Sequence, residues 1–467
     1  MRMAWIGILA AAAGAWAAPP VFESTVADQT DVAVTAYNNG LALVRDVRKV
    51  KLASGEAYLR FADVAAQIRA ETVSLKSLAA PGSAGILEQN YEYDLMSPSK
   101  LMEKYVGKPV RLVNFSTQIG FQQVEAELLS LNEGPVYRVN GEIYLGHPGY
   151  VVLPEIPENL IAKPSLVWLI ENAREDQELE VQYLTRGISW RADYVLNLDR
   201  DDASLDLAGW VTMDNQSGAT YANARLKLVA GEVSIVSPEI EATEEYAADD
   251  KLGVALDRMP AEEAFAEYHL YTMPRRTTIK QNQSKQLALL EAGGVRCAKR
   301  FEYRGQEHFY SGPMPPTREE HVEVFLEFEN REDNHLGIPL PGGIMRIYQQ
   351  DSEGMAQFAG EDRIEHTPKD EKVRLRMGKA FDVVGERVQK DYQRISNKTH
   401  ECCYEITLRN HKENDIVVEV VEPMPSDWKV LESSQDFEKR DAHTAVFRVP
   451  VKTDGTAMVT YRVRVTY

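Results

Sequence analysis

The chain has 467 residues, 44% of them hydrophobic, and its 52 Lys and Arg residues against 71 Asp and Glu residues give a formal net charge of −19. This hydrophobic content excludes a disordered tail and a fibrous repeat, and the acidic balance disfavours a protein that coats nucleic acid or an anionic membrane, because Lys and Arg hold both. Three cysteines exclude a disulfide-dense scaffold and a four-cysteine zinc site.

Residues 1–18 predict a secretory signal peptide. Arg2 precedes an uncharged run from Met3 to Ala18, which closes with Ala15-Trp16-Ala17, the small-residue pattern that signal peptidase recognises. The run is about 16 residues long, whereas a membrane-spanning helix needs roughly 20. A buried N-terminal helix is the alternative, but two prolines follow at once. We therefore expect an exported protein, periplasmic or secreted, with no transmembrane segment in the mature chain.

Residues 19–99 predict an N-terminal β region. Alternating apolar residues at 31–37 and an apolar run at 41–44 flank Asn38-Asn39-Gly40, which suits the connection of a hairpin. Further strands are expected at 58–61 and 72–75. A helix then follows, because Ser97 can cap it, Pro98 fits its first position and Gly107 can end it.

Residues 100–153 predict a small β-barrel-like unit. Strands are expected at 110–113, 124–131 and 136–145, and the last of these turns at Asn140-Gly141. Both turn positions need a positive φ, which Asn and Gly tolerate, so this dipeptide is the strongest hairpin signal in the chain. Prolines from Pro154 onward mark the end of the unit.

The remaining chain predicts two β-sandwich regions, 154–236 and 268–467, joined by an acidic linker at 237–267. Six carboxylates fall within 239–250 with no basic residue among them, and such a run repels itself. A short helix at 261–268 is an alternative within the linker. Strands in the two regions are expected at 167–169, 179–183, 194–198, 226–229, 321–328 and 457–467.

Three of the expected strands end in an apolar-x-apolar-x-Asn pattern, at Asn215, Asn330 and Asn410. An Asn can cap a strand end through its own side-chain hydrogen bonds, which fits the hairpins of immunoglobulin-like sandwiches. The predicted fold class is all-β and multi-domain, with immunoglobulin-like β-sandwiches, a small inserted β-barrel-like unit and few short helices.

No compact catalytic or metal-binding motif occurs in the sequence. None of the nine histidines forms H-E-x-x-H, and there is no G-x-S-x-G elbow, phosphate loop or dinucleotide fingerprint. On a strand, Glu319, His321 and Glu323 would share one face and could hold a metal, but the preferred interpretation is an exposed polar strand face. The segment 199–206 resembles a calcium loop but lacks the sixth-position Gly and the final Glu, so a turn explains it. No cofactor and no metal are expected.

The cysteines leave the pairing open. Cys402 and Cys403 are neighbours on a predicted strand, where adjacent side chains point to opposite faces. One of them is expected to be a buried thiol, and a bond from the other to Cys297 is one alternative.

Two aromatic-rich segments, 190–194 and 268–271, are candidate surfaces for a sugar or a peptide, with core packing as the alternative. The candidate catalytic residues, both weak, are Asp193 and His269. The candidate binding residues are Trp190, Tyr194, Tyr268, Tyr271 and Arg275.

Nine segments of the sequence share one family pattern: 34–44, 87–95, 187–194, 209–215, 226–231, 268–274, Gly337-Ile338-Pro339-Leu340-Pro341-Gly342-Gly343, 380–387 and 406–412. Together they resemble a bacterial family, the domain of unknown function 4139. The resemblance implies an exported β-rich protein, and it carries over no activity and no catalytic residue. Relatives with an added N-terminal coiled coil bear the label mucoidy inhibitor-like, but this chain has no such heptad segment.

These observations predict an exported cell-envelope protein that serves as a binding or structural β module, with an envelope protein or a glycan as partner and no nucleic acid. One alternative is a hydrolase acting on an envelope polymer, with a site assembled around Trp190, Asp193, His269 and Arg275. The other is a calcium-dependent adhesion-like module that uses residues 199–206.

Overall fold

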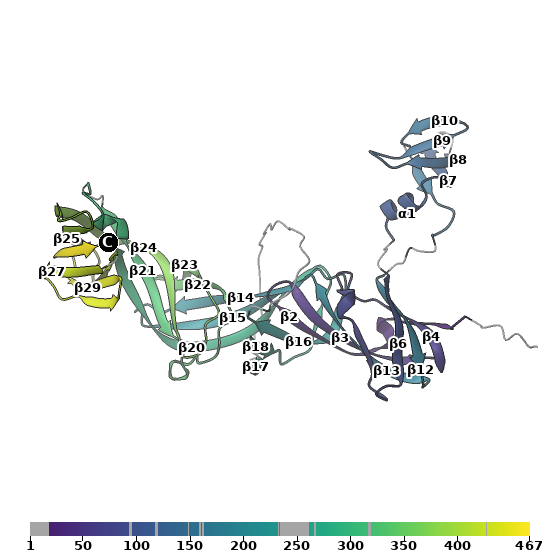
Figure 1. Cartoon of the computed structure of the whole chain (residues 1–467), viewed down its shortest axis with the longest axis horizontal. Coiled ribbons are helices and arrows are strands. Elements are labelled where there is room, and N and C mark those ends of the chain that lie inside the picture. The colour runs from purple at the N-terminus through teal and green to yellow at the C-terminus, as the bar shows by residue number, and fades with distance from the viewer. Residues whose placement is uncertain are drawn as a thin grey trace, which may run out of the picture. The chain divides into compact units, whose positions relative to one another are not determined.

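The structure is a computed structural model that describes residues 18–92, 96–116, 120–147, 149–157, 160, 163–231, 233, 261–265, 268–315, 319–425 and 427–467. The predicted signal peptide, apart from Ala18, and the acidic run at 239–250 lie outside these residues. The chain forms two compact units (Figure 1). The first takes the chain up to Ser189 with Asp214–Lys227 and Arg275–Gln283; the second comprises Trp190–Met213, Leu228–Pro274 and Ser284–Tyr467.

The first unit is built on two sheets whose alternating side chains form its core. In β2 (Gln29–Tyr37) every second residue from Val32 to Ala36 is buried, and the hairpin to β3 (Leu41–Lys51) turns at Gly40 with φ +78°. The predicted hairpin is therefore confirmed. One sheet has the order β1 (Val21–Ser24), β4 (Gly55–Ala62), β12 (Ser165–Asn172), β6 (Ala84–Glu92); the other runs β16 (Tyr221–Ala230), β2 (Gln29–Tyr37), β3 (Leu41–Lys51), β13 (Asp176–Arg186), β5 (Ser74–Ser77), and β19 (Thr277–Ile279) pairs with β16. The short 3-10 helices η1 (Val26–Asp28) and η2 (Ala70–Thr72) connect these strands.

An inserted segment between β6 and β12 has its own small core. Helix α1 (Pro98–Lys104) forms as predicted, because the Ser97 side chain accepts a hydrogen bond from the Lys100 amide and Pro98 occupies the first turn. Asn140 and Gly141 both have positive φ, 50° and 87°, and join two strands as predicted. The strand order is β10 (Glu142–Leu145), β9 (Val136–Val139), β8 (Gly120–Ser130), β7 (Pro109–Ser116), β11 (Tyr150–Val152), so the described strands form an open sheet, not a closed barrel.

The second unit is dominated by one long sheet. Its strand order is β23 (Ala356–Ile364), β22 (Gly343–Gln350), β14 (Ile188–Leu198), β15 (Ser204–Asn215), β20 (Gln283–Arg304), β21 (Glu320–Glu329), β24 (Lys372–Arg394), β25 (Thr399–Asn410), β30 (Gly455–Thr466), β27 (Asp427–Ser433). The last residues of β20, from Phe301 to Arg304, also pair in parallel with β26 (Ile416–Pro423). β26 pairs with β29 (Thr444–Val451), and β29 pairs with β28 (Glu438–Asp441). A core that includes Tyr404, Ile406, Phe447 and Val463 fills this C-terminal sandwich. Two 3-10 helices, η3 (Glu307–Tyr310) and η4 (Glu332–Asn334), complete the unit.

The three strand-end asparagines cap their strands as the sequence predicts. Each is almost completely buried and uses its side chain to hold the turn that follows. Asn215 accepts from the Ser217 amide and donates to Ala219 O, Asn330 accepts from Gly337 and donates to Ile338 O, and Asn410 accepts from Lys412 and donates to Asn414 O. Buried amides need such partners, so these contacts fix three turns. The expected hairpins are wrong, because the strand after each turn pairs with other strands and not with the one before it.

The strand content of the described residues confirms the all-β class. The alternative of a helix at 261–268 is wrong, because β17 (Ala261–Phe265) pairs antiparallel with β18 (Tyr268–Thr272). Pairing with a neighbouring strand outweighs local helix propensity there. The described part of the chain contains no helix with the length and apolarity needed to span a bilayer.

Candidate functional site

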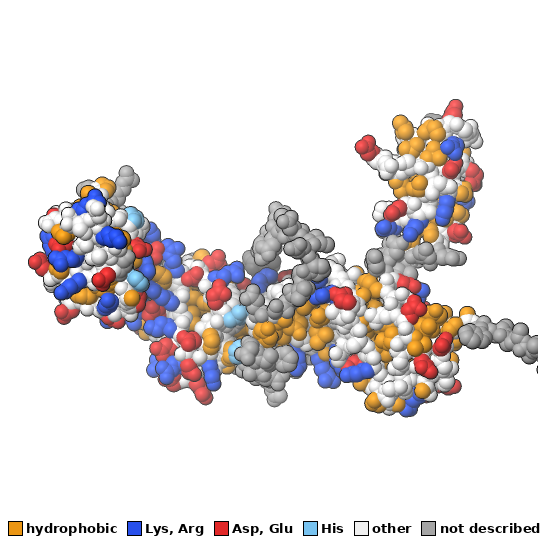
Figure 2. Space-filling view, viewed as in Figure 1, with side chains coloured by type: hydrophobic (Ala, Val, Ile, Leu, Met, Phe, Trp, Pro, Cys, Tyr) orange, Lys and Arg blue, Asp and Glu red, His pale blue; other side chains and the backbone are white. Residues whose placement is uncertain are grey.

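Side chains from seven strands, β20, β21, β23, β24, β26, β28 and β29, make one charged surface in the second unit, which we call the charged face. It consists of Arg300, Glu302, Arg304, Glu323, Glu327, Asp362, Lys372, Arg374, Arg376, Glu419, Arg440 and Arg448. Residues at every second position of a strand share a face, so Arg300, Glu302 and Arg304 of β20 lie together. Register places Ala298 opposite Glu327 of β21 and Glu327 opposite Arg374 of β24. On the other side, Glu302 lies opposite Glu419 of β26, and Glu419 lies opposite Arg448 of β29. Basic and acidic side chains interleave over the surface of this unit (Figure 2).

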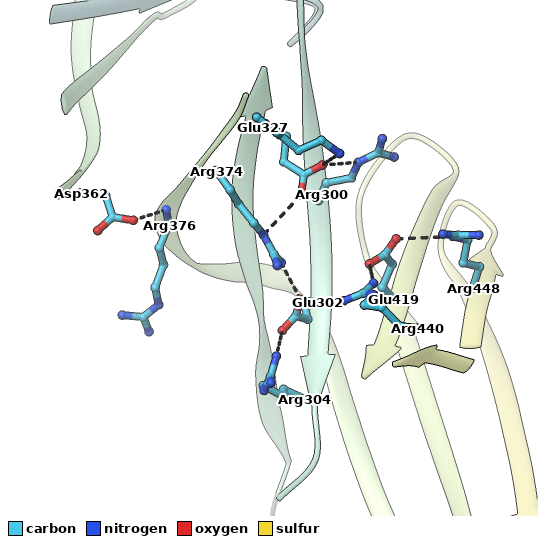
Figure 3. A network of polar contacts seen from close by, with 11 residues as sticks. Arg300, Glu302, Arg304, Glu327, Asp362, Arg374, Arg376, Glu419, Arg440 and Arg448 are labelled. Atoms are coloured by element: carbon cyan, nitrogen blue, oxygen red, sulfur yellow. Dashed lines mark hydrogen bonds and ion pairs between the residues drawn. The ribbon is translucent and has the colours of Figure 1, made fainter. Parts of the chain in front are cut away.

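Glu302 and Glu327 hold the middle of the charged face together (Figure 3). The Glu302 side chain is 3% exposed and binds Arg374 Nη2 at 2.5 Å and Arg304 Nη1 at 3.2 Å. Glu327 binds Arg374 Nε at 3.3 Å and Arg300 Nε at 3.4 Å. The Arg374 guanidinium also lies over the Phe325 ring, 3.9 Å from its centroid. Two carboxylates and one ring thus fix the orientation of Arg374.

The charged face continues on both sides of this centre. The Arg376 side chain binds Glu323 at 2.8 Å, and its backbone amide donates to Asp362 at 2.7 Å. Beyond β20, Glu419 binds Arg440 at 2.9 Å and Arg448 at 3.5 Å (Figure 3). The guanidinium groups are therefore held at fixed positions on rigid strands while several remain half exposed.

A pocket of about 450 Å³ opens beside the charged face. Three cations, Arg296, Arg300 and Lys372, and three carboxylates line it together with the Asn334 amide. Arg296 donates to Asn334 Oδ1 at 3.2 Å and to Asp333 O at 2.9 Å, so η4 fixes this wall. Guanidinium groups donate and carboxylates accept hydrogen bonds, so the wall offers both to a hydroxyl-rich ligand. The complete lining is Arg296, Cys297, Ala298, Arg300, Glu327, Phe328, Glu329, Asp333, Asn334 and Lys372.

Cys297 in the pocket wall is a poor nucleophile. Burial, helped by the charges of Asp199 and Asp202, raises the pKa of its thiol to about 12, and the nucleophilic thiolate is scarce at neutral pH. Burial likewise raises the pKa of Cys402 to about 12. All three cysteines are free thiols, so the alternative of a bond to Cys297 is not realised.

The structure places Asp193 on the opposite face of β14 from Trp190 and Tyr194, because their numbers differ by odd steps. Trp190 and Tyr194 are 4% and 0% exposed and belong to the core. Asp193 binds Arg346 at 3.0 Å, Thr212 at 2.9 Å and Arg191 at 3.5 Å. These contacts form a polar row across β22, β14 and β15. The predicted catalytic role of Asp193 stays a prediction.

The two aromatic segments converge on the loop Pro339–Gly343. The Tyr194 hydroxyl donates to Pro341 O at 2.8 Å, and the Tyr271 hydroxyl donates to Pro339 O at 2.9 Å. Burial raises the pKa of Tyr194 well above 10, and the nearby Tyr271 and Asp193 raise it further, so Tyr194 remains a hydrogen-bond donor. Three of the segments that carry the family resemblance thus meet here, and the two tyrosines act as supports of a loop.

The other predicted binding and catalytic residues are less closely grouped. The Tyr268 ring covers Gly231, where an added Cβ would lie 2.5 Å from Tyr268 Cδ1. His269 is half-buried on β18 and close enough to His366 to lower the pKa of that histidine, after the larger effect of burial. Arg275 belongs to the first unit, whereas the other candidates belong to the second.

The residues that could have been metal ligands contact other groups of the protein instead. The Glu319 side chain binds Arg409, His321 Nδ1 contacts Ala380 O at 2.9 Å, and Glu323 binds Arg376. The Asp199 carboxylate accepts hydrogen bonds from the Ala203 and Ser204 amides and the Ser204 hydroxyl. Searching the described residues finds no group of three or more His, Cys, Asp or Glu side chains placed to hold a metal ion.

The charged face was not predicted, although the sequence contains a signal for it. Charged residues repeat with period two in Arg300-x-Glu302-x-Arg304 and Lys372-x-Arg374-x-Arg376. What the sequence does not give is the strand order, which brings 300–304, 372–376, 419 and 448 side by side.

Comparison with known proteins identifies the family. No curated protein matches the chain. The family model described as Domain of unknown function (DUF4139) matches residues 179–467, which contain the charged face, its pocket and the loop Pro339–Gly343. The two resembling segments at 34–44 and 87–95 lie outside the matched range. Because the match covers more than half of the chain, the protein belongs to the DUF4139 family.

Proposed function

We propose that this chain is a binding module of the bacterial cell envelope, and that the charged face with its pocket is where it holds a hydroxyl-rich glycan. The observation that carries the proposal is the continuity of the two features. Arg300, Glu327 and Lys372 belong both to the ion-pair network and to the pocket wall. A ligand in the pocket would therefore meet side chains whose positions the network fixes, which reduces the entropy lost on binding.

The chemistry of the pocket suits a sugar polymer better than an ionic ligand. Its cations and carboxylates are equal in number, so the wall attracts neither a strong anion nor a strong cation. Arg300 and Lys372 are about half exposed, at 51% and 56%, and keep donors available beyond their contacts with Glu327.

The pKa shifts of three groups in the second unit suit structural roles. A general acid or base works best with a pKa near the operating pH. Here burial moves the pKa of Tyr303 and Cys297 up to about 12. Asp199 shifts the other way, because hydrogen bonds from Ser204 and Ala203 outweigh its burial and lower its pKa. The proposal therefore gives these three groups no catalytic role.

Cosedimentation of the purified chain with isolated peptidoglycan sacculi and with neutral envelope polysaccharides tests the proposal. Removing two pocket cations in Arg300→Ala/Lys372→Ala is expected to weaken binding about tenfold, because each loses hydrogen bonds to the ligand. The matched control is Lys390→Ala/Lys452→Ala, which removes two exposed cations with ion-pair partners elsewhere in the same unit.

Two results would overturn the proposal. One is that the pocket variant binds the glycans no more weakly than its control, either because both bind like wild type or because both lose affinity equally. The other is the release of soluble product from the sacculi by the wild-type chain, with loss of release in His269→Ala, which would establish the hydrolase instead.

A further inference from the structure

A second cluster of cations lies in the first unit and shares no residue with the charged face. It follows one line across the sheet order β16, β2, β3, β13, β5 and alternates in sign. We call it the basic row, and it consists of Arg225, Asp31, Arg45, Glu180 and Lys76, with Arg276 beside Asp31.

The two carboxylates of the basic row anchor its cations, and Asp31 is partly buried whereas Glu180 is almost completely buried. Asp31 binds Arg276 at 2.7 Å, Arg45 at 3.1 Å and Arg225 at 3.3 Å. Glu180 binds Arg45 at 2.5 Å and Lys76 at 2.7 Å, and its side chain is 3% exposed. Burial would raise the pKa of Asp31, but the arginine contacts, led by the Arg276 hydrogen bond, outweigh it and leave the pKa lowered. Asp31 is therefore ionised at neutral pH.

The cations of the basic row face the solvent. The side chains of Arg225 and Lys76 are each 63% exposed, and those of Arg45 and Arg276 are about one third exposed. Four cations against two carboxylates leave two positive charges in excess in the basic row. The whole chain carries −19, so this excess is a local departure from the charge of the molecule.

The spacing of the cations indicates the kind of anion that fits. Arg225 and Arg45 both bind Asp31 Oδ2, and Arg45 and Lys76 bind the two oxygens of Glu180, so the cations follow one another across the sheet from β16 to β5. The row crosses four strand spacings, roughly 19 Å in all. This length exceeds one small anion, whereas a linear polymer crossing the strands can meet the cations in turn. Nucleic acid fits poorly. Each strand of a DNA duplex presents a phosphate about every 3.4 Å, and this protein, with its negative net charge, repels so dense a negative charge.

From this geometry we propose that the basic row binds an acidic polysaccharide, a linear chain of sugars that bear carboxylate or sulfate groups. Guanidinium groups donate paired hydrogen bonds to such groups, and Arg276 is held in place by a further bond from its Nη1 to Asn223 O at 3.1 Å. The row uses none of the residues of the charged face, so either site can fail its test without the other.

The test measures binding of the purified chain to immobilised dextran sulfate and polygalacturonate, with neutral dextran and a thymidine oligonucleotide for comparison, at two salt concentrations. Wild-type protein is expected to bind the two acidic polysaccharides. Arg225→Gln/Arg276→Gln is expected to weaken this binding about tenfold at low salt. The plot of log K against log salt is expected to become less steep by roughly 1.4, because two cationic contacts are lost.

The matched control is Lys100→Gln/Arg138→Gln, which removes two ion-paired cations from the inserted segment and is expected to bind like wild type. If the double variant does not fold, the single variants Arg225→Gln and Lys76→Gln take its place, because they alter the most exposed side chains of the row. Each of them is expected to weaken binding to the acidic polysaccharides. Unchanged affinity in the row variants, an equal loss in the control, or tighter binding to the oligonucleotide than to either polysaccharide would overturn the proposal.

Discussion

Arg387 and Glu422 form an ion pair inside the C-terminal sandwich, with side chains 1% and 0% exposed. Glu422 Oε2 accepts hydrogen bonds from Arg387 Nη1 and from the Tyr310 hydroxyl, both at 2.7 Å. Burial raises the pKa of Tyr310 well above 10, and the Glu422 charge adds to this, so the tyrosine stays a donor. The first unit also contains a buried ion pair, between Arg48 and Asp46, which lie 2.8 Å apart.

Breaking the buried pair on one side is expected to be costly. Glu422→Ala leaves a buried guanidinium without its counter-ion and should lower the free energy of unfolding by about 3–5 kcal/mol. Replacing both partners in Arg387→Leu/Glu422→Leu should cost much less, because no charge remains buried. Urea unfolding at neutral pH measures both.

The control for this prediction is Glu438→Ala, which breaks an exposed contact with Arg448 and should cost less than about 1 kcal/mol. A single variant no less stable than the double variant would contradict the expected role of the pair.

At the scale of elements, the segment after β20 is shaped by the same ion pair. A Cβ on Gly305 would lie 2.3 Å from Glu422 Oε2 and 3.0 Å from Arg387 Nη1, so only glycine allows the chain to pass this close. The neighbouring η3 then places Tyr310 against Glu422.

Gly305→Ala is expected to destabilise the protein by about 1–3 kcal/mol, since a tightly packed region must shift to admit a methyl group. Gly312→Ala is the matched control, because nothing lies within 4 Å of its added Cβ. Thermal unfolding of the two variants checks this, and equal midpoints would contradict it.

The elements differ in how far the sequence predicted them. The β2–β3 hairpin, helix α1 and the turn at Asn140-Gly141 follow from local signals, because capping and positive φ depend on a few adjacent residues. The 22 residues of β20 were not predicted as one strand. Two of its partners, β15 and β26, come from distant parts of the chain, and pairing with them and with the following strand β21 decides its length.

At the scale of the molecule, the proposed location depends on the N-terminus. The predicted signal peptide implies that the exported chain begins near residue 19. Mass measurement of the periplasmic or secreted protein from the producing cell should give a chain shortened by about 17–18 residues. A variant that lacks residues 2–18 should stay in the cytoplasm, and a full-length mass in the exported fraction would contradict cleavage.

The sequence by itself determined the all-β class, the strand-end asparagine turns and the family, because alternation, side-chain capping and motif identity are properties of adjacent residues. Its aromatic site candidates proved to be mostly buried supports, with Trp190 and Tyr194 in the core. Only the tertiary structure decided which charges meet. Arg300, Arg374 and Arg448, like Asp31, Arg225 and Arg276, are far apart in sequence, and strand order alone brings each set onto one surface.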